Sequence, residues 1–418
     1  MSETQTPTLS PPLTPPDPTR SRQHRELMAV AERAASALTG RSPEIEARRS
    51  LPPDIADSLA AAGLYRLLTP AAYGGHETPP ASYFLLIERL ARADAAAAWC
   101  CFIANTSCVN AAYLPEAEAR LLFGPPSLKA AGVFAPRGKA VPSVQDGVAG
   151  LRVNGRWAWG SGAHNADIVI PGCLLIGADG QPALLPGGAP RVVSVVLDRA
   201  QVRLLDNWDS FGLCGTGSGE FEVSDAFVPL GRSASLFDGP RISTPLYRFP
   251  VFGLLALSIA AVATGIAQQA LADFIALASH SVPQASTKPL ASKPTVQDAV
   301  ARAEATLQGA RAYLMASIAT AWDAALDGRA SADPTGTGLP LDARRDLRLA
   351  SSHAVQSAAE VVGRLYRLAG GGAVFAQSPL QRALRNVQVA TQHMMVNDAS
   401  FELTGRLLLG VPTQTAML

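Results

Sequence analysis

Two residues of this chain have the chemistry for proton transfer and hydrogen bonding at a reaction centre. His393 follows Gln392, and an imidazole has an ordinary pKa of about 6.5, so both of its protonation forms are accessible near neutral pH. Ser161 lies in the sequence Trp159-Gly-Ser-Gly162, where its hydroxyl or backbone N–H could bind a ligand. Each residue also has an ordinary structural explanation, as a core histidine on a helix and as a turn serine.

The other histidines and the cysteines do not form a metal or disulfide pattern. The chain has five cysteines, an odd number, and none of them form a Cys-x-x-Cys pair. Its six histidines do not cluster with carboxylates at ligand spacing. We therefore expect no metal site and reduced, mostly buried thiols in a cytoplasmic protein.

A glycine-rich run and three other residues offer candidate binding features. The run Gly215-Thr-Gly217-Ser-Gly could approach a phosphate, but no strand–helix–strand unit surrounds it, so we interpret it as a loop that approaches a ligand. Trp208 offers a flat surface on which a planar ligand could stack. Trp99 and Asn105, on a helical segment, could line a substrate pocket.

The composition is that of a large folded protein, without the excess of positive charge that is typical of nucleic-acid binding. Of 418 residues, 48% are hydrophobic and 17% charged, which is enough apolar surface for a sizeable core. The formal net charge is +1 and aromatic residues make up 6%. A near-neutral chain with few aromatics predicts neither phosphate-backbone binding nor base stacking.

One segment is long and apolar enough to raise the question of a membrane. Residues 249–272 contain no charge, which meets the length requirement for a spanning helix. The segment is rich in alanine and includes Gly253, Gly265 and the pair Gln268-Gln269. This composition favours a helix inside a bundle, and we expect no membrane association.

The order of patterns along the chain predicts an N-terminal helical domain, an antiparallel β-barrel or sandwich, and a C-terminal four-helix bundle. We place them at residues 21–129, 130–240 and 241–418, after a disordered leader over residues 1–20. The expected helices include one that begins at Leu51-Pro-Pro, one over 83–98, the uncharged segment, and segments 270–278, 295–325, 342–368 and 381–409. The expected strands lie near 150–154, 166–170, 191–197 and 220–223.

From about residue 25 to residue 410 the chain resembles the acyl-CoA dehydrogenase superfamily. The resemblance is carried by Leu51-Pro-Pro with Tyr73-Gly-Gly, by Asn154-Gly-Arg, by Val223-Ser-Asp-Ala-Phe-Val-Pro, and by Gly370-Gly-Gly followed by Arg385-Asn. It implies a mainly α fold with a central β-domain, a flavin held between that domain and the bundle, and a homotetramer.

The chain departs from the dehydrogenases at their catalytic base. Those enzymes use a Glu shortly after the motif that matches Arg385-Asn386, and Met394 occupies that place here. Some members carry the base on the first bundle helix, near the position of Leu255. Neither a thioether nor an alkyl side chain accepts a proton. The flavin-binding Thr-Glu-Pro loop is also replaced, by Ala135-Pro-Arg-Gly.

The same departures resemble the two-component, reduced-flavin-dependent monooxygenases built on this scaffold. The matching motifs are Gly155-Arg-Trp-Ala-Trp-Gly-Ser-Gly, Asn207-Trp-Asp with the glycine-rich run, and Gln392-His393 followed by Gly405-Arg-Leu-Leu-Leu-Gly. The resemblance implies that reduced FMN or FAD arrives from a separate flavin reductase, reacts with O2 to form a C4a-hydroperoxyflavin, and oxygenates a small organic substrate.

It also implies roles for individual residues. His393 would lie near flavin C4a and Ser161 near N5, with Trp208 stacked on the isoalloxazine ring. Further cofactor contacts would come from Gly162, Gly215, Gly217, Gly371 and Gly372. Trp99, Asn105 and Met394 would line the substrate site.

Two alternatives stay open at this point. The first is an acyl-CoA dehydrogenase whose base lies elsewhere, with Asp398 and Glu402, further along the expected His393 helix, as candidates. The second is a non-catalytic relative that keeps the fold, because one scaffold hosts several chemistries.

Overall fold

The computed structural model describes residues 21–185, 188–284, 286–328 and 339–418. The predicted leader over residues 1–20 lies outside the described residues. The N-terminal helices are α1 (Arg22–Leu38), α2 (Ser42–Arg48), α3 (Pro53–Ala61), α4 (Pro80–Ala93), α5 (Ala95–Cys108) and α6 (Glu116–Phe123). The C-terminal helices are α7 (Pro245–Arg248), α8 (Val251–His280), α9 (Pro294–Asp327), α10 (Leu341–Ala369), α11 (Pro379–Thr391) and α12 (Asp398–Leu408).

Between these two groups lies one mixed sheet. Its strands are β1 (Ala130–Gln145), β2 (Val148–Trp157), β3 (Ile168–Leu175), β4 (Val192–Val195), β5 (Leu197–Asp198), β6 (Arg203–Leu204), β7 (Phe221–Pro229) and β8 (Ser233–Ala234). The order is β6-β7-β2-β1-β3-β4-β8, with β5 paired to β3. The predicted fold class is confirmed, although β1 and β3 pair in parallel, so the sheet is not purely antiparallel.

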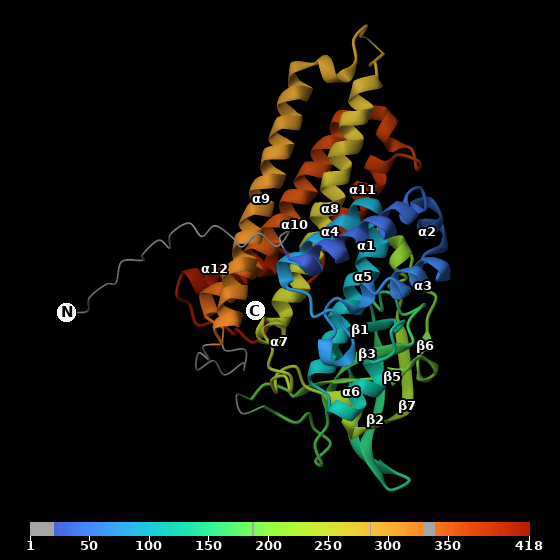
Figure 1. Ribbon diagram of the computed structural model, residues 1–418, viewed down its shortest axis with the longest axis vertical. Coiled ribbons are helices and arrows are strands. Elements are labelled where there is room, and N and C mark those ends of the chain that lie inside the picture. The colour runs from blue at the N-terminus through green and yellow to red at the C-terminus, as the bar shows by residue number, and fades with distance from the viewer. Residues whose placement is uncertain (1–20, 186–187, 285, 329–338) are drawn as a thin grey trace, which may run out of the picture.

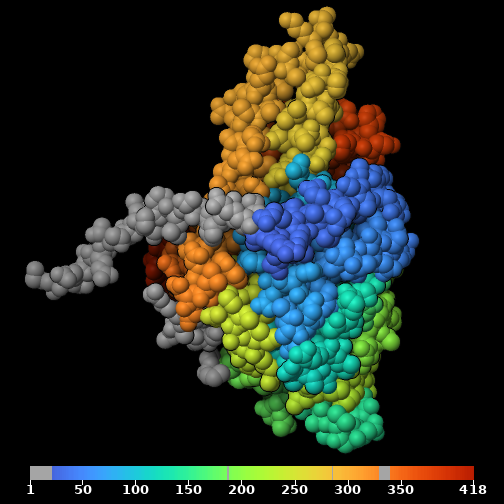
Figure 2. Space-filling model, viewed as in Figure 1, coloured from blue at the N-terminus to red at the C-terminus, as the bar shows by residue number. Residues whose placement is uncertain are grey.

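The molecule is elongated, with the sheet at one end and the bundle of α8–α11 at the other (Figure 1). Helices α4 and α5 lie between them, and both contact α8. The upper halves of α8 and α9 project beyond the N-terminal helices (yellow and orange in Figure 2). The N-terminal helices and the bundle share one apolar core, while the sheet has its own. The division into three domains stays a prediction.

The predicted single helix over 83–98 is wrong, because the helix is interrupted at Asp94, between α4 and α5. Asp94 has extended backbone (φ −154°) and its carboxylate accepts a hydrogen bond from the backbone N–H of Ala97. This is an N-cap, which supplies an acceptor for an otherwise unpaired N–H at the start of a helix. A second hydrogen bond, from Ser42 Oγ at 2.7 Å, ties the cap to α2.

The predicted helix over 381–409 is also two helices, α11 and α12, separated by residues 392–397. Met395 and Val396 in this turn are both buried in the shared core. The segment between the two helices therefore carries both side chains into the core. His393 therefore lies in a turn and not on a helix.

The strand β1 was not expected as a strand, because Pro136, Gly138 and Pro142 interrupt its pattern. Its pairing with β3 shifts register between Val133 and Gly138, an irregularity that accommodates the proline. At Gly138 a Cβ atom would lie 2.1 Å from the Trp157 ring, so only glycine fits there.

The uncharged helix is a core helix of the bundle. Helix α8 extends from Val251 to His280, and it also absorbs the helix expected at 270–278. Within the described residues, α8 and the segment Ala95–Ala112 are long and apolar enough to cross a membrane, but 83% and 89% of their most apolar stretches are buried inside the protein. That burial is what a core helix shows.

Candidate active site

A cavity of about 350 Å³ lies where α5, the sheet, the start of α8 and the turn after α11 meet. Five residues singled out from the sequence lie in its wall: Trp99, Ser161, Trp208, His393 and Met394. They come from four separate segments of the chain, so the fold and not the sequence spacing brings them together. The other wall residues are mostly apolar, including Ile103, Val133, Phe134, Ile170, Leu236, Val251 and Phe252.

The turn between α11 and α12 fixes the orientation of His393. Its Nδ1 accepts a hydrogen bond from the backbone N–H of Met395 at 3.2 Å. A neutral imidazole carries one proton, so this bond places the proton on Nε2 and makes that nitrogen a donor. The ring also lies edge-on to Trp99, with 6.1 Å between the ring centroids.

Burial, and to a smaller extent the positive charge of Arg348, together lower the pKa of His393 to about 4. Arg348 is itself buried, and its guanidinium donates to the carbonyl of Met417. The expectation that both forms of His393 are accessible near neutral pH is therefore wrong. At pH 7 the ring is neutral, and its donor is Nε2–H.

Ser161 begins a chain of hydrogen bonds that the sequence did not reveal. Trp99 Nε1 donates to Ser161 Oγ at 3.2 Å, and Ser161 Oγ lies 2.5 Å from Ser218 Oγ. Ser218 Oγ lies 2.6 Å from Thr216 Oγ1, which donates to the carbonyl of Leu213 at 2.8 Å. All four side chains are buried, and all four line the cavity.

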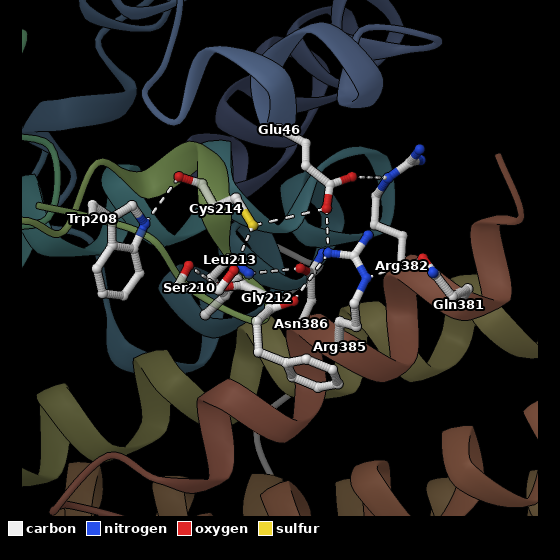
Figure 3. A network of polar contacts seen from close by, with 11 residues as sticks. Glu46, Trp208, Ser210, Gly212, Leu213, Cys214, Gln381, Arg382, Arg385 and Asn386 are labelled. Carbon is white, nitrogen blue, oxygen red and sulfur yellow. Dashed lines mark hydrogen bonds and ion pairs between the residues drawn. The ribbon is translucent and has the colours of Figure 1, made fainter. Parts of the chain in front are cut away.

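A polar network holds the loop that carries these hydroxyls and Trp208 (Figure 3). Trp208 is half-buried, and its Nε1 donates to the carbonyl of Cys214 at 3.0 Å, which fixes the plane of the indole. The backbone N–H of Leu213, a residue with left-handed backbone (φ 51°), donates to Asn386 Oδ1 on α11 at 2.7 Å. Arg385 donates to the carbonyl of Phe211 at 3.0 Å.

The same network ties α11 to α2 through Glu46. Arg382 Nε donates to Glu46 Oε2 at 3.1 Å, and Arg385 forms a second ion pair with this carboxylate. Burial alone would raise the pKa of Glu46, but the hydrogen bonds from the two arginines outweigh it and the pKa lies below its ordinary value. Three segments far apart in sequence therefore meet at the loop, and its backbone is held from two sides.

The structure does not place Asn105 in the cavity wall. Its side chain is fully buried. Nδ2 donates to the carbonyls of Leu64 at 2.8 Å and Cys101 at 2.9 Å, and Oδ1 accepts from the N–H of Leu68. With its hydrogen-bonding groups engaged by the backbone, Asn105 supports the fold of the N-terminal helices and does not face a substrate.

The predicted glycine contacts are not among the residues of the wall either. Gly215 and Gly217 pack against the N-terminal helices: a Cβ at Gly215 would lie 2.2 Å from Ile45 Cγ2, and one at Gly217 would lie 3.2 Å from the carbonyl of Arg49. Gly162 has left-handed backbone (φ 76°) and donates to the carbonyl of Thr216 at 2.9 Å. These close approaches let the loop run beside the cavity.

Gly371 and Gly372 lie elsewhere, in the exposed turn between α10 and α11. A Cβ at either position would meet no atom within 4 Å. In this chain they do not take part in the cavity.

Both positions at which the dehydrogenases carry their base lie in the wall. Met394 and Leu255 line the cavity. No Asp or Glu lines it among the residues that the structure describes. Asp398 and Glu402 are not in the wall, and Glu402 instead faces Arg406 on the same helix. The arrangement therefore offers no carboxylate to abstract a proton from a bound substrate.

The residues present fit a flavin ring system. Flat indole surfaces at Trp99 and Trp208, a lone-pair acceptor at Ser161 and an N–H donor at His393 surround a mostly apolar space. This combination of aromatic surfaces and a few directional polar groups is typical of cofactor and small-molecule sites.

Comparisons with known proteins agree with this geometry. Residues 21–118 match the model of the acyl-CoA dehydrogenase N-terminal domain, and residues 257–398 match that of the C-terminal domain. An indole-3-acetate monooxygenase from Pseudomonas putida is 34% identical over 371 residues, 88% of this chain and 89% of its own length. The oxygenase subunit HsaA of a flavin-dependent monooxygenase from Rhodococcus jostii is 27% identical and covers 91% of this chain and 97% of its own length.

A solved structure of XiaF from Streptomyces sp. in complex with FADH2 and glycerol superposes with a TM-score of 0.83. It is 26% identical in sequence, and the match covers 94% of this chain and 98% of that one.

Proposed function

Since this chain belongs to the flavin-dependent monooxygenases built on the acyl-CoA dehydrogenase fold, we propose that its cavity holds a reduced flavin beside Ser161, Trp208 and His393 and oxygenates an aromatic substrate. The observation that carries the proposal is the wall itself. This wall contains a neutral histidine and a serine in mostly apolar surroundings. Met394 and Leu255, neither of which can accept a proton, stand at the two positions where the dehydrogenases carry their base.

A reduced flavin, when bound, supplies the two electrons that activate O2. In the overall reaction one oxygen atom enters the substrate and the other leaves as water. The chain's own residues must then hold protons and exclude bulk water. His393 holds a proton at Nε2, the apolar wall limits water, and Ser161 offers a lone pair to a flavin N–H.

The substrate we propose is a small aromatic compound with an N–H or O–H group. Apolar side chains such as Ile103, Val133 and Phe252 suit the ring, and no Lys or Arg appears among the described residues of the wall. Asn110, also in the wall, donates through Nδ2 to the carbonyl of Ser107 and leaves its buried Oδ1 without a partner. A buried acceptor without a partner is costly, and a substrate donor would satisfy it. The relatives named for indole-3-acetate and for resorcinol act on substrates of this kind.

The phosphate end of the flavin would lie in a second cavity, of about 260 Å³, that shares Ala135 and Trp159 with the first. Arg137, Arg156 and Glu220 are among the residues that line it. Arg156 is paired with Glu220, while Arg137 has no ion-pair partner among the described residues and is free to bind an anion. Both FMN and FAD carry a phosphate at the end of the ribityl chain, so this cavity suits either one.

We further propose a cytoplasmic homotetramer that receives its reduced flavin from a separate reductase. The elements of the described residues all belong to the helices and the single sheet of this fold, and this supports the supply of reduced flavin by another protein. Gly371 and Gly372 are exposed and remote from the cavity, so the cofactor contact predicted for them would have to be made to a flavin in a neighbouring subunit. The projecting ends of α8 and α9 (Figure 2) offer helical surface for such packing.

The proposal is tested with photoreduced FMN or FAD, which removes the need for a reductase, mixed with 18O2 and either indole or phenol. We expect a hydroxylated product that carries one 18O atom. Product without 18O, or consumption of O2 to hydrogen peroxide alone with every substrate, would overturn it. The variant His280→Ala, at the exposed end of α8, serves as a control that should behave as the wild type.

A further inference from the structure

The buried hydroxyls of Ser161, Ser218 and Thr216 form a chain of hydrogen bonds whose direction is set by its two ends. At one end Trp99 Nε1 can only donate, and it points to Ser161 Oγ at 3.2 Å. At the other end the carbonyl of Leu213 can only accept, and it receives the proton of Thr216 Oγ1 at 2.8 Å. Neither end can reverse its role.

These ends fix the hydroxyls between them. Since the Thr216 hydroxyl donates its hydrogen bond to the Leu213 carbonyl, its oxygen must accept a hydrogen bond from Ser218 at 2.6 Å. Ser218 then has no proton left and must accept from Ser161 at 2.5 Å. Each hydroxyl carries one proton, so all three protons are used inside the protein. What Ser161 presents to the cavity is a lone pair.

We infer that Thr216 and Ser218 are positioning residues that make Ser161 select a ligand N–H over a ligand acceptor at this point of the cavity. The inference rests on the proposed function, in which flavin N5 lies beside Ser161. A reduced flavin carries an N–H at N5, whereas an oxidised flavin carries an acceptor nitrogen there. The chain of hydroxyls therefore favours the reduced cofactor.

The size of the preference follows from what the oxidised form would require. For Ser161 to donate to an acceptor in the cavity, both hydrogen bonds of the chain must reverse: Ser218 must donate to Ser161, and Thr216 must donate to Ser218. The hydrogen bond from Thr216 to the Leu213 carbonyl is then lost, while that carbonyl keeps its bond from the Thr216 N–H at 3.0 Å. One net hydrogen bond corresponds to a preference of roughly 2- to 13-fold.

The burial of the chain supports this selection. Ser161, Ser218 and Thr216 are 3%, 5% and 1% exposed, so little of their surface is open to a water that could replace a missing donor or acceptor. The loop that carries Thr216 and Ser218 is also held by α11 through Asn386 and Arg385. The backbone that leads to these two hydroxyls is therefore anchored.

The test is an anaerobic titration of the full-length protein with FMN in both redox states. In Thr216→Val the isosteric side chain removes the acceptor for Ser218, so the ratio of oxidised to reduced dissociation constants should fall roughly 2- to 13-fold. Ser218→Ala should lower the ratio at least as far, because Ser161 then has a proton to offer to the cavity. Thr216→Ser keeps the hydroxyl and should leave the ratio at its wild-type value. Ser351→Ala, which removes a buried serine hydroxyl from α10, is the matched control.

Two further readouts separate selection from general damage. The midpoint potential of bound flavin should fall in Thr216→Val, because a tenfold change in the ratio corresponds to about 30 mV for a two-electron couple. With oxidised 5-deaza-FMN, in which carbon replaces N5, Thr216→Val should have no more effect than the control. A variant that weakens both redox forms of FMN equally would overturn the inference and leave the proposed function standing. A wild type that binds neither form would overturn both.

Discussion

The protonation state of His393 gives the most specific prediction. Lowering the pH from 8 to 5 should leave this imidazole neutral, because burial and the charge of Arg348 lower its pKa from 6.5 to about 4. A tenfold change in proton affinity is worth about 1.4 kcal/mol, so charging the ring in the folded protein costs about 3 kcal/mol more than in the unfolded chain.

The assay is NMR of protein labelled with 15N only in histidine, with the variant His393→Gln to assign the resonance. Between pH 8 and pH 5 the His393 signals should report a neutral ring with the proton on Nε2, since Nδ1 accepts from Met395. Arg348→Gln should raise the pKa, but not to 6.5, because burial is the larger cause. Titration of wild-type His393 near pH 6.5, or a proton on Nδ1, would refute the reasoning.

The same shift has a consequence for stability with a definite sign. Below pH 6.5 the unfolded chain binds a proton at this position that the folded protein does not, so folding stability falls as the pH drops from 6.5 towards 4. The variant His393→Gln lacks this loss. The free energy of unfolding, measured by denaturant titration, should therefore change in favour of the variant across that range, by up to about 3 kcal/mol.

Three further predictions concern other parts of the site. His393→Ala removes the Nε2–H donor, so the ratio of hydrogen peroxide to oxygenated product should rise roughly tenfold, as measured by peroxidase-coupled detection; an unchanged ratio would contradict its role. Asn105→Leu leaves the backbone N–H of Leu68 without its acceptor and removes a donor from the carbonyls of Leu64 and Cys101, which should cost about 3 kcal/mol of stability in denaturant unfolding, while the affinity for reduced flavin should hold; a loss of affinity with normal stability would mean that it faces the site. Arg137→Gln should weaken reduced FMN binding by about two- to fivefold in calorimetry without affecting riboflavin, which lacks the phosphate; equal effects on both would exclude a phosphate contact.

The fold class could be predicted because its signals are local and repeated. Helices with apolar positions at helical spacing and short strands separated by Gly, Pro and Asp follow one another in the order that the structure shows. The errors occurred where tertiary packing decides. The break at Asp94 had a local signal, an acidic N-cap before an alanine run, but the turn at His393 depends on burying Met395 and Val396 in a core formed by distant helices.

Part of the cavity wall could be predicted from the sequence, and the limit is again non-local contact. Trp99, Ser161, Trp208, His393 and Met394 line one cavity, and their motifs pointed to them.

The hydrogen bonds of Thr216 and Ser218 could not be predicted from the sequence, although both residues lie inside the glycine-rich run. Their importance depends on distances to Ser161, 55 or more positions earlier in the chain, which no spacing rule reports. Asn105 shows the opposite case, because a polar residue near a site can be fully used by the backbone.

The central claim is that this cavity is where reduced flavin binds, and a crystal structure of the protein grown anaerobically with reduced FMN tests it directly. We predict a flavin ring in the cavity of about 350 Å³, with N5 within hydrogen-bond distance of Ser161 Oγ and with Trp208 and His393 against the ring system. A flavin bound elsewhere on the chain, with this cavity left to solvent, would contradict the account.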